Sequence, residues 1–474
     1  MNAPIVRLYV LVAALFGLLV LSTSWWTVFE AEGLRDNALN RRTLLEEARI
    51  ERGRIRSADG TLLARSVPAP GDTWQRTYPS GDLFGHAIGY SYTNLGRSGL
   101  EQSRNGLLTG QDTEIDSLVD QLAGKRREGD DVTTNLDAEG QRAALEALGG
   151  QRGAVVAIEP RTGRVKVMAS VPQYDPNRVQ RSFRRLARQD GSPLLNRATQ
   201  GGYPPGSTFK VVTAAAALDS GRYTPDSMVS GKNGKAISGV PLRNFGGQDY
   251  GSIPLTEALT NSVNTVWGEV GVKLGRARMG EYMERFGFYR KPPLDYPAAQ
   301  RAASGEFGRR GRLLDPESRQ IDVGRMAIGQ DKLAVTPLQM ATVAATVANG
   351  GLRMKPRLTR RAVDPDGRTS ESIDAEEAER VMRRSTASQL TRMMANVVKE
   401  GTGTAAALEG IEVAGKTGTA EIDPARDINQ VWFVGFAPVR NPRIAVAVTL
   451  ERSDGEGGTV AAPIAKRVME TLLR

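Results

Sequence analysis

Three short stretches of the sequence combine a side chain that can act as a nucleophile with one that can move a proton. In the first, Pro-Pro-Gly at 204–206 precedes Ser207, and Lys210 follows three residues later. Proline and glycine cannot continue a helix, whereas the segment that ends at Gly221 can. Ser207 is therefore predicted to lie at a helix N-terminus, where free N–H groups stabilise developing negative charge. Residues three apart share a helix face, which brings the Lys210 amine within reach of the Ser207 hydroxyl.

A lysine acts as a base only when it is neutral, so the pKa of Lys210 must fall from ~10.4 towards ~7–8. Burial, the helix N-terminus and a second nearby cation all lower that pKa. The chain has no cysteine, and His86 is its single histidine. Thiol catalysis and a zinc site built on several histidines are therefore excluded. Ser-x-x-Lys also occurs by chance, and a helix-capping Ser207 is the alternative interpretation.

The second stretch holds a serine and an asparagine separated by one residue. Ser262 and Asn264 lie in TNSVNTVWGEVG, within a region of mostly helical periodicity. Positions i and i+2 of a helix do not share a face, so these side chains need a special backbone geometry to reach one cleft. A second Ser-x-Asn runs from Ser103 to Asn105, and a capping serine or a polar turn is the alternative for both copies. Only its position in the sequence, after Ser207, favours the copy at Ser262 over the copy at Ser103.

The third stretch is AGKTGTAE, which contains Lys416 and Gly418. Residues 410–417 also satisfy the phosphate-loop pattern G-x-x-x-x-G-K-[ST], but that pattern needs a helix that starts at the lysine, and these residues are typical of a strand. A strand that lines a cleft would present Lys416 on one face, and Gly418 would let a substrate backbone approach closely. Thr417 and Thr419 can offer hydroxyls to a carboxylate, and the Thr419 N–H can join an oxyanion hole.

The order of strand-like and helix-like segments predicts how these stretches meet. A hairpin over 153–170 precedes a mostly helical region from about 207 to 400. Strand patterns then return at 411–422, 430–438 and 443–451, before an amphipathic C-terminal helix. One antiparallel sheet completed from both ends and covered by helices on both faces is therefore expected. The predicted fold class is α/β (α+β), a three-layer α/β/α domain with a central antiparallel sheet.

The N-terminus predicts a membrane anchor. Residues 8–29 carry no charged side chain, are long enough to span a bilayer, and end near Trp25 and Trp26. A cleaved signal peptide is the alternative, but its apolar region usually has only ~7–15 residues. We therefore predict a cytoplasmic tail over 1–7 and a single-pass anchor over 8–29.

Two further parts are expected beyond the anchor. Residues 30–130 read as a mixed, extended anchor module with a hairpin at 52–64 and a short helix at 98–112, and the charged stretch 124–131 marks its end. Residues 131–474 would then form the catalytic domain. The chain has 63 Lys and Arg against 53 Asp and Glu, a surplus of +10. No long basic block is interleaved with aromatics, so nucleic acid is not expected as a partner, and an Arg-rich solvated surface explains the surplus.

Ser-x-x-Lys, Ser-x-Asn and Lys-Thr-Gly occur in this order and together resemble the active-serine constellation of penicillin-binding proteins and serine β-lactamases. Ser-Val-Asn departs from the Ser-Asp-Asn of that constellation. Longer stretches, such as RGRIRSADGTLLARS, GLEQSRNGLLTG, GAVVAIEPRTGRVKVMASVPQYDPN and GTGTAAALEGIEVAGKTGTAE, resemble class B penicillin-binding proteins. The resemblance covers nearly the whole chain and is greatest to the short actinobacterial penicillin-binding protein A type.

This resemblance implies a role for each residue. Ser207 would be the acylated nucleophile and Lys210 its base. Ser262 would relay a proton to the leaving amine, and Asn264 would bond the amide of the donor peptide. Lys416 would supply positive potential and help to keep Lys210 neutral.

The substrate site is implied in the same way. Thr417, Gly418 and Thr419 would line it, with both threonine hydroxyls on the terminal carboxylate of the substrate. The backbone N–H groups of Ser207 and Thr419 would form the oxyanion hole. No cofactor and no metal is implied. The reaction would be ping-pong acyl transfer from a D-Ala-D-Ala stem peptide to an amine on a neighbouring stem, with β-lactams as covalent inhibitors.

The resemblance also implies a location and partners. Peptidoglycan lies outside the cytoplasmic membrane, so the catalytic domain would be extracellular and the N-terminus cytoplasmic. A membrane-embedded glycan polymerase of the SEDS type would contact the anchor and its module. Three alternatives remain: a β-lactamase or D,D-carboxypeptidase that passes the acyl group to water, a non-enzymatic scaffold or β-lactam sensor, and a nucleotide-binding protein.

Overall fold

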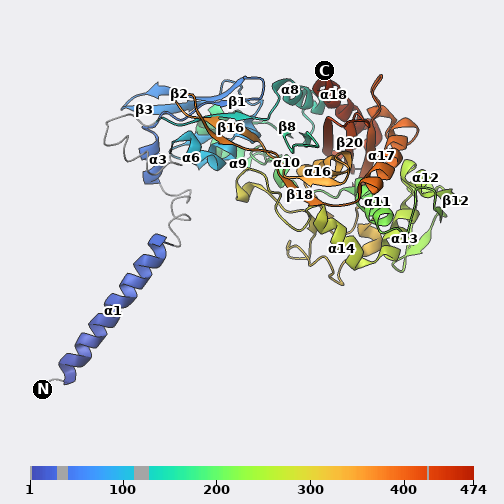
Figure 1. The fold of residues 1–474 in the computed structure, drawn as a ribbon, viewed down its shortest axis with the longest axis horizontal. Helices are drawn as coiled ribbons and strands as arrows, with labels where there is room; N and C mark the ends of the chain where they lie inside the picture. Colours follow the sequence, from blue (N-terminus) through green and yellow to red (C-terminus); the bar gives the residue numbers. More distant parts are fainter. Residues whose placement is uncertain (1–2, 29–40, 111–127, 424–425, 427) are drawn as a thin grey trace.

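The fold consists of an apolar N-terminal helix and an elongated α/β body (Figure 1). The computed structural model describes residues 3–28, 41–110, 128–423, 426 and 428–474. Parts of the predicted tail, anchor and boundary stretch therefore lie outside the described residues, namely residues 1–2, Phe29 and residues 124–127. Helix α1 (Ala3–Val28) is long and apolar enough to cross a membrane, with a mean hydropathy of 2.4 in its most apolar window. The helix begins at Ala3 and contains the predicted uncharged span from Leu8 up to Val28.

The catalytic half is built on a five-stranded antiparallel sheet. Its strands, in spatial order, are β19 (Ala414–Asp423), β20 (Ile428–Ala437), β21 (Ile444–Ser453), β7 (Gly153–Ile158) and β8 (Val165–Val171). The first two strands in sequence form the expected hairpin, and the last three pair beside them. The prediction of one sheet completed from both ends of the domain is confirmed.

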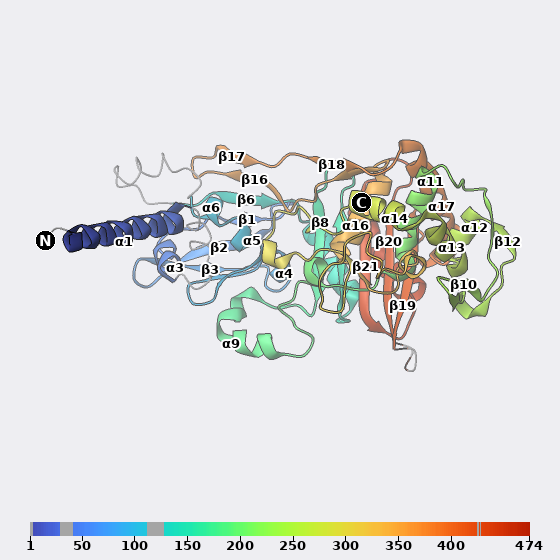
Figure 2. The same ribbon diagram turned by 90° about the horizontal axis from the view of Figure 1, so that it is seen from below.

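Helices cover both faces of this sheet, as Figures 1 and 2 show. One face packs against α8 (Ala138–Leu148) and α18 (Ala462–Leu473), and the other against α16 (Pro337–Ala348). Successive residues of β7 divide between two separate apolar cores: Val155 belongs to the core under α8, and Val156 to the core on the opposite face. Because side chains alternate along a strand, a continuous apolar run such as GAVVAI is buried on both sides.

A second sheet of six strands lies towards the N-terminal side of the body. Its strands, in spatial order, are β17 (Thr369–Ser372), β16 (Thr359–Val363), β6 (Asp131–Thr134), β1 (Ile55–Arg56), β2 (Leu62–Ala69) and β3 (Thr73–Thr77). The hairpin predicted over 52–64 is present, with Ile55 opposite Ala64. This sheet combines strands from both sides of the predicted boundary at residue 131, because β6 pairs with β1 on one edge and with β16 on the other.

Two local predictions need correction. Within the predicted segment 98–112, whose last two residues lie outside the described residues, two short helices form rather than one, α5 (Gly99–Ser103) and α6 (Asn105–Leu108), with Arg104 between them. The region from 207 to 400 also contains short strands between its helices, among them the pair β15 (Leu352–Met354) and β18 (Glu377–Arg380). The helical periodicity missed these strands because they have only three and four residues, which is too short to establish a period, and none of their side chains is buried.

Candidate active site

Ser207 lies on a tight turn that leads into a buried helix. The turn is the 3-10 helix η1 (Gly206–Phe209), and α11 (Lys210–Asp219) follows it directly. Gly206 has a φ of 52°, and a Cβ built on it would lie 2.9 Å from the carbonyl oxygen of Thr419. Glycine is therefore required both for the backbone conformation and for the close approach of β19.

Side chains three residues apart eclipse one another in a 3-10 turn, so Ser207 and Lys210 lie on the same side of the chain. Ser207 is partly exposed, and within the described part of the chain its hydroxyl has no hydrogen-bond partner. Lys210 in contrast is fully buried. The pair therefore presents an accessible hydroxyl next to a desolvated amine.

The Lys210 amine is held by the turn that carries Ser262. Its Nζ lies 2.7 Å from the Ser262 carbonyl oxygen, 3.1 Å from the Ser262 Oγ and 2.7 Å from the Asn264 Oδ1. Burial lowers the pKa of Lys210 well below its ordinary value, and the positive charge of Lys416 lowers it further. This is the direction that a lysine base requires.

The left-handed backbone of Ser262 explains how two residues at positions i and i+2, Ser262 and Asn264, can reach one site. Ser262 has a φ of 57° and lies between α12 (Leu255–Thr260) and α13 (Asn264–Leu274). Such a backbone conformation is uncommon for a residue with a side chain and is typical of functional sites. The reversal lets Ser262 and Asn264, two positions apart, reach the same amine.

Strand β19 brings the third stretch to this turn. Lys416 is fully buried, and its Nζ donates to the Ser262 Oγ at 2.9 Å and to the Thr417 carbonyl oxygen at 3.0 Å. Burial lowers the pKa of Lys416 to about 7. The Ser262 hydroxyl therefore lies between two lysine amines.

The surroundings of Gly418 give a further reason for the absence of a side chain. A Cβ on Gly418 would lie 2.8 Å from the Pro205 carbonyl oxygen and 2.9 Å from the Thr208 Cγ2. The turn that carries Ser207 thus fills the space beside Gly418, and this close approach of the protein's own chain is what requires the missing side chain.

The two threonines of β19 differ in environment. Thr419 is partly exposed, and its Oγ1 accepts a hydrogen bond from the Gly457 N–H at 3.2 Å. Thr417 is buried, and its Oγ1 lies 2.6 Å from the Oγ1 of Thr402. Thr402 is the residue that the sequence analysis missed. The only signal was its place in the glycine-rich GTGT stretch that precedes β19.

The phosphate-loop pattern, His86 and the second Ser-x-Asn play other parts in the described structure. Residues 414–423 form a strand and no helix begins at Lys416, so the phosphate-loop pattern is not matched by its structure. His86 is buried away from this site, with its Nε2 2.8 Å from the Pro193 carbonyl oxygen, and burial lowers its pKa to about 4. The other Ser-x-Asn is used in packing: Ser103 donates to the Asp295 carbonyl oxygen, and Asn105 accepts from Arg52. The part of the chain that the structure describes contains no group of three or more side chains placed to hold a metal ion.

Two protein families match the sequence. Residues 153–470 match the penicillin binding protein transpeptidase domain, and residues 52–132 match the penicillin binding protein A dimerisation domain.

Known proteins match over almost the full length. The chain is 34% identical to the peptidoglycan D,D-transpeptidase PbpA of Mycolicibacterium smegmatis, with 100% of this chain and 99% of the relative aligned. It is 35% identical, with the same coverage, to the peptidoglycan D,D-transpeptidase PbpA of Mycobacterium tuberculosis. The structure of penicillin-binding protein A from M. tuberculosis as a ceftriaxone acyl-enzyme complex superposes with a TM-score of 0.82 at 32% identity, and covers 91% of this chain and 100% of that chain.

Proposed function

The chain belongs to the penicillin-binding protein transpeptidase family and is a serine-type peptidoglycan D,D-transpeptidase, and from this premise we propose that Ser207 is its acylated nucleophile. The observation that carries this assignment is the chain of contacts from Lys210 through the Ser262 hydroxyl to Lys416. Lys210 follows Ser207 on the same turn, and its pKa, which burial and the charge of Lys416 lower, lets it act as a base without any histidine.

Acylation follows from this arrangement. The Ser207 Oγ attacks the carbonyl carbon of the penultimate D-alanine, and neutral Lys210 takes the proton that Ser207 loses. The N–H groups of Ser207 and Thr419 stabilise the oxyanion, a term of about 3–4 kcal/mol per donor. The contact between Gly206 and the Thr419 backbone supports this pair of donors, because it brings the two segments together.

The leaving group needs a proton, and Ser262 is the proposed carrier. Lys416 donates to the Ser262 Oγ, and Lys210 donates to the same oxygen once it carries the proton of Ser207, which leaves the Ser262 O–H free to donate to the departing amine. The proton from Ser207 then passes through Lys210 and Ser262 to the nitrogen of the leaving D-alanine. An amine of a neighbouring stem attacks the acyl-enzyme, loses its proton along the same path, and returns the hydroxyl of Ser207.

Substrate binding is proposed for the remaining residues. Asn264 accepts from Lys210 through its Oδ1 and donates through its Nδ2 to the Arg243 carbonyl oxygen, so it is held at the entrance to the site, ready to bond the donor amide. Thr419 is the accessible hydroxyl for the terminal carboxylate. Buried Thr417 acts beside it, with its position fixed by Thr402. Gly418 contributes by allowing η1 and β19 to meet.

Labelling with fluorescent penicillin tests the nucleophile. The wild type is expected to form a covalent adduct that mass spectrometry places on Ser207, and Ser207→Ala and Lys210→Ala are expected to label hardly at all. Matched controls are Ser103→Ala and Lys273→Ala, both outside the site, which should label normally. An adduct on another serine would contradict the assignment. Rapid hydrolysis of the antibiotic would instead favour a β-lactamase or D,D-carboxypeptidase, which transfers the acyl group to water.

Orientation and partner are proposed as well. The catalytic residues would lie outside the membrane and Ala3 inside, because the substrate is extracellular. The chain has no cysteine, so a membrane-impermeant maleimide on intact cells should label Ser385→Cys and not Ala3→Cys; the reverse pattern would invert the topology. A SEDS-type glycan polymerase is proposed to contact α1 and the module that follows it. Co-purification with such a polymerase should be lost when an unrelated apolar helix replaces α1.

A further inference from the structure

Helix α9 (Pro176–Arg188) carries a surface charge that the catalytic site does not use. Its thirteen residues include five arginines and no acidic residue. All five arginines are exposed, and they equal half of the chain's surplus charge of +10. Four of them, Arg178, Arg181, Arg185 and Arg188, follow a spacing that places them on one face of the helix.

The opposite face of α9 already has its packing partners. Val179 is fully buried in a small apolar cluster with Tyr92 and Tyr174, and Phe183 and Leu186 pack against it. The arginine face is therefore turned away from the body and is not needed to hold the helix in place. Like charges spaced three or four residues apart destabilise a helix, so folding alone does not explain this face.

Within the described residues, only one of the five arginines has an acidic partner, and that pair is weak. Arg178 lies 3.5 Å from Asp175, but its side chain is 82% exposed, where such a pair is screened by solvent. Arg181, Arg184, Arg185 and Arg188 form no ion pair within the described ranges of the chain.

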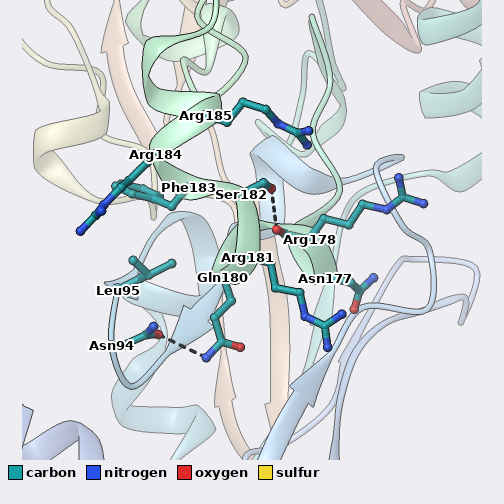
Figure 3. A pocket seen from close by; sticks show the side chains of 10 residues that line it. All are labelled: Asn94, Leu95, Asn177, Arg178, Gln180, Arg181, Ser182, Phe183, Arg184 and Arg185. Atoms are coloured by element: carbon teal, nitrogen blue, oxygen red, sulfur yellow. Dashed lines mark hydrogen bonds between the residues drawn. The ribbon is translucent and has the colours of Figure 1, made fainter.

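Four of the five arginines, Arg178, Arg181, Arg184 and Arg185, border a hollow of about 950 Å³. Figure 3 shows Arg178, Arg181 and Arg185 extending to one side of α9 and Arg184 to the other. Gln180 reaches down from the helix and donates to the Asn94 Oδ1 at 3.4 Å. The result is a concave, cationic surface between α9 and the turn at Asn94.

An arginine-lined surface is suited to binding anions, and the position of α9 indicates that these anions belong to a membrane. Although α9 follows the first two strands of the catalytic sheet in sequence, Figure 2 shows it beside the N-terminal sheet. Its first turn is tied there, since Asn177 donates to the Tyr78 carbonyl oxygen and Tyr92 donates to that of Pro176. The turn at Asn94 continues to Arg97, which pairs with Glu47 at the end of α3 (Arg41–Glu47), the first described element after α1.

We propose that the arginine face of α9 binds the anionic phospholipid headgroups of the bilayer that α1 spans, and so holds the body against the membrane surface. Guanidinium groups pair with phosphate through two parallel hydrogen bonds, which suits lipid headgroups. The segment 29–40 connects α1 to α3 and spans at most ~43 Å when fully extended. This tether keeps α9 at a high effective concentration near the surface. A dissolved anionic polymer would gain nothing from that tether.

The test uses the full-length protein in lipid nanodiscs. Because the chain has no cysteine, Ala187→Cys, an exposed position on α9, accepts a single fluorophore. Quenching by a lipid with a nitroxide headgroup is then compared in phosphatidylcholine discs with and without phosphatidylglycerol. We expect quenching to rise about threefold with the anionic lipid and to fall again at high salt.

Substitution of the arginines tests whether they cause the excess quenching. The excess quenching should disappear when the four arginines of this face are replaced by glutamine, in R178Q/R181Q/R185Q/R188Q, and should persist with four lysines at the same positions. A matched set of exposed arginines elsewhere, replaced in R309Q/R310Q/R312Q/R319Q, removes the same charge and should leave the excess unchanged. Retained penicillin labelling shows that each variant is folded.

Two results would overturn the proposal. The first is equal quenching with and without phosphatidylglycerol. The second is a response of the fluorophore to soluble poly(glycerol phosphate) in neutral discs that the glutamine variant loses, without any lipid dependence. That outcome would assign the arginine face to a polymer of the cell envelope. Neither readout depends on catalysis, so failure here leaves the assignment of Ser207 untouched.

Discussion

At the scale of single residues, the site depends on two lysines that share one serine hydroxyl. Lys210 must be neutral to act as a base, whereas Lys416 contributes most when it is charged. The two requirements are coupled, because the charge on Lys416 is one of the causes that lower the pKa of Lys210. Removing one amine therefore changes the titration of the other.

We predict an acid limb in the pH dependence of acylation. The rate of reaction with penicillin should fall at low pH, because Lys210 takes up a proton and can no longer accept one from Ser207. In Lys416→Met the limb should move to higher pH, since the pKa of Lys210 rises when the neighbouring positive charge is lost. Stopped-flow acylation over a range of pH measures the shift. Lys235→Met, on the surface strand β10 (Lys235–Ile237), should leave the limb in place, and an unmoved limb in Lys416→Met would contradict the coupling.

Thr402 provides a second test at this scale. Thr402→Val keeps the shape of the side chain but removes its hydrogen bond to Thr417. Acylation efficiency should fall by about five- to tenfold, as expected for a neutral hydrogen bond of about 1–1.5 kcal/mol. Thr402→Ser restores the hydroxyl and should recover most of the rate, with little change in thermal stability. Full activity in the valine variant would show that Thr417 needs no such support.

The residue types of the site could be predicted from sequence, but their environment could not. Ser-x-x-Lys, Ser-x-Asn and Lys-Thr-Gly indicated which side chains to examine. Nothing in the sequence reported the burial of Lys416 or the left-handed backbone of Ser262. Thr402 was missed because it acts through another residue, and a lone threonine in a polar turn carries no pattern.

At the scale of elements, the decisive contact is between η1 and β19. The strand supplies Lys416 and Thr419, and the turn supplies Ser207, so their relative position determines whether the nucleophile meets the oxyanion donors. Gly206 and Gly418 allow this contact from opposite sides.

Gly418→Ala should disturb the site by separating these two elements. Its Cβ would meet the Pro205 carbonyl oxygen at 2.8 Å, which is backbone and cannot move alone. We expect a loss of about 1–3 kcal/mol in the free energy of unfolding together with a large loss of penicillin labelling. Gly202→Ala is the control, because the nearest neighbour of its Cβ is Ala334 at 3.7 Å. Chemical denaturation and labelling measure both effects, and an alanine variant with wild-type labelling would contradict this account.

Helices and strands with strong periodicity could be predicted well. The completion of the catalytic sheet from both ends of the domain followed from two apolar runs before the helical region and three after it, whereas the spatial order of the strands was not predicted. The six-stranded sheet could not be predicted, because β1 and β16 are separated by about three hundred residues of sequence, and β1 has only two residues.

At the scale of the whole molecule, Asp295 joins the N-terminal and catalytic parts. Its carboxylate accepts from the backbone N–H groups of Leu358 at 2.6 Å and Thr359 at 2.8 Å. It also pairs with Arg104 at 2.9 Å, and Arg104 in turn donates to the Thr359 Oγ1. One carboxylate thus connects α5 and α6 to the start of β16.

Asp295→Ala should loosen this junction. It leaves two backbone donors and a guanidinium without their acceptor, at a cost of about 2–4 kcal/mol. Hydrogen exchange at Leu358 and Thr359 should accelerate, while penicillin labelling is retained because the site lies elsewhere. Asp315→Ala removes a carboxylate that accepts only from a local turn and should leave exchange at these amides unchanged. Unaltered exchange in Asp295→Ala would show that other contacts hold the two parts together.

The shared six-stranded sheet also decides how the protein can be shortened for laboratory work. Cutting the chain at residue 131 would isolate the catalytic sequence but would strip β1, β2 and β3 from β6. The unpaired edge of β6, and the apolar surface around Val132, would then face water, and such edges promote aggregation. A shortened protein that begins at Arg41 keeps every strand of this sheet paired, and should be the soluble form that yields crystals.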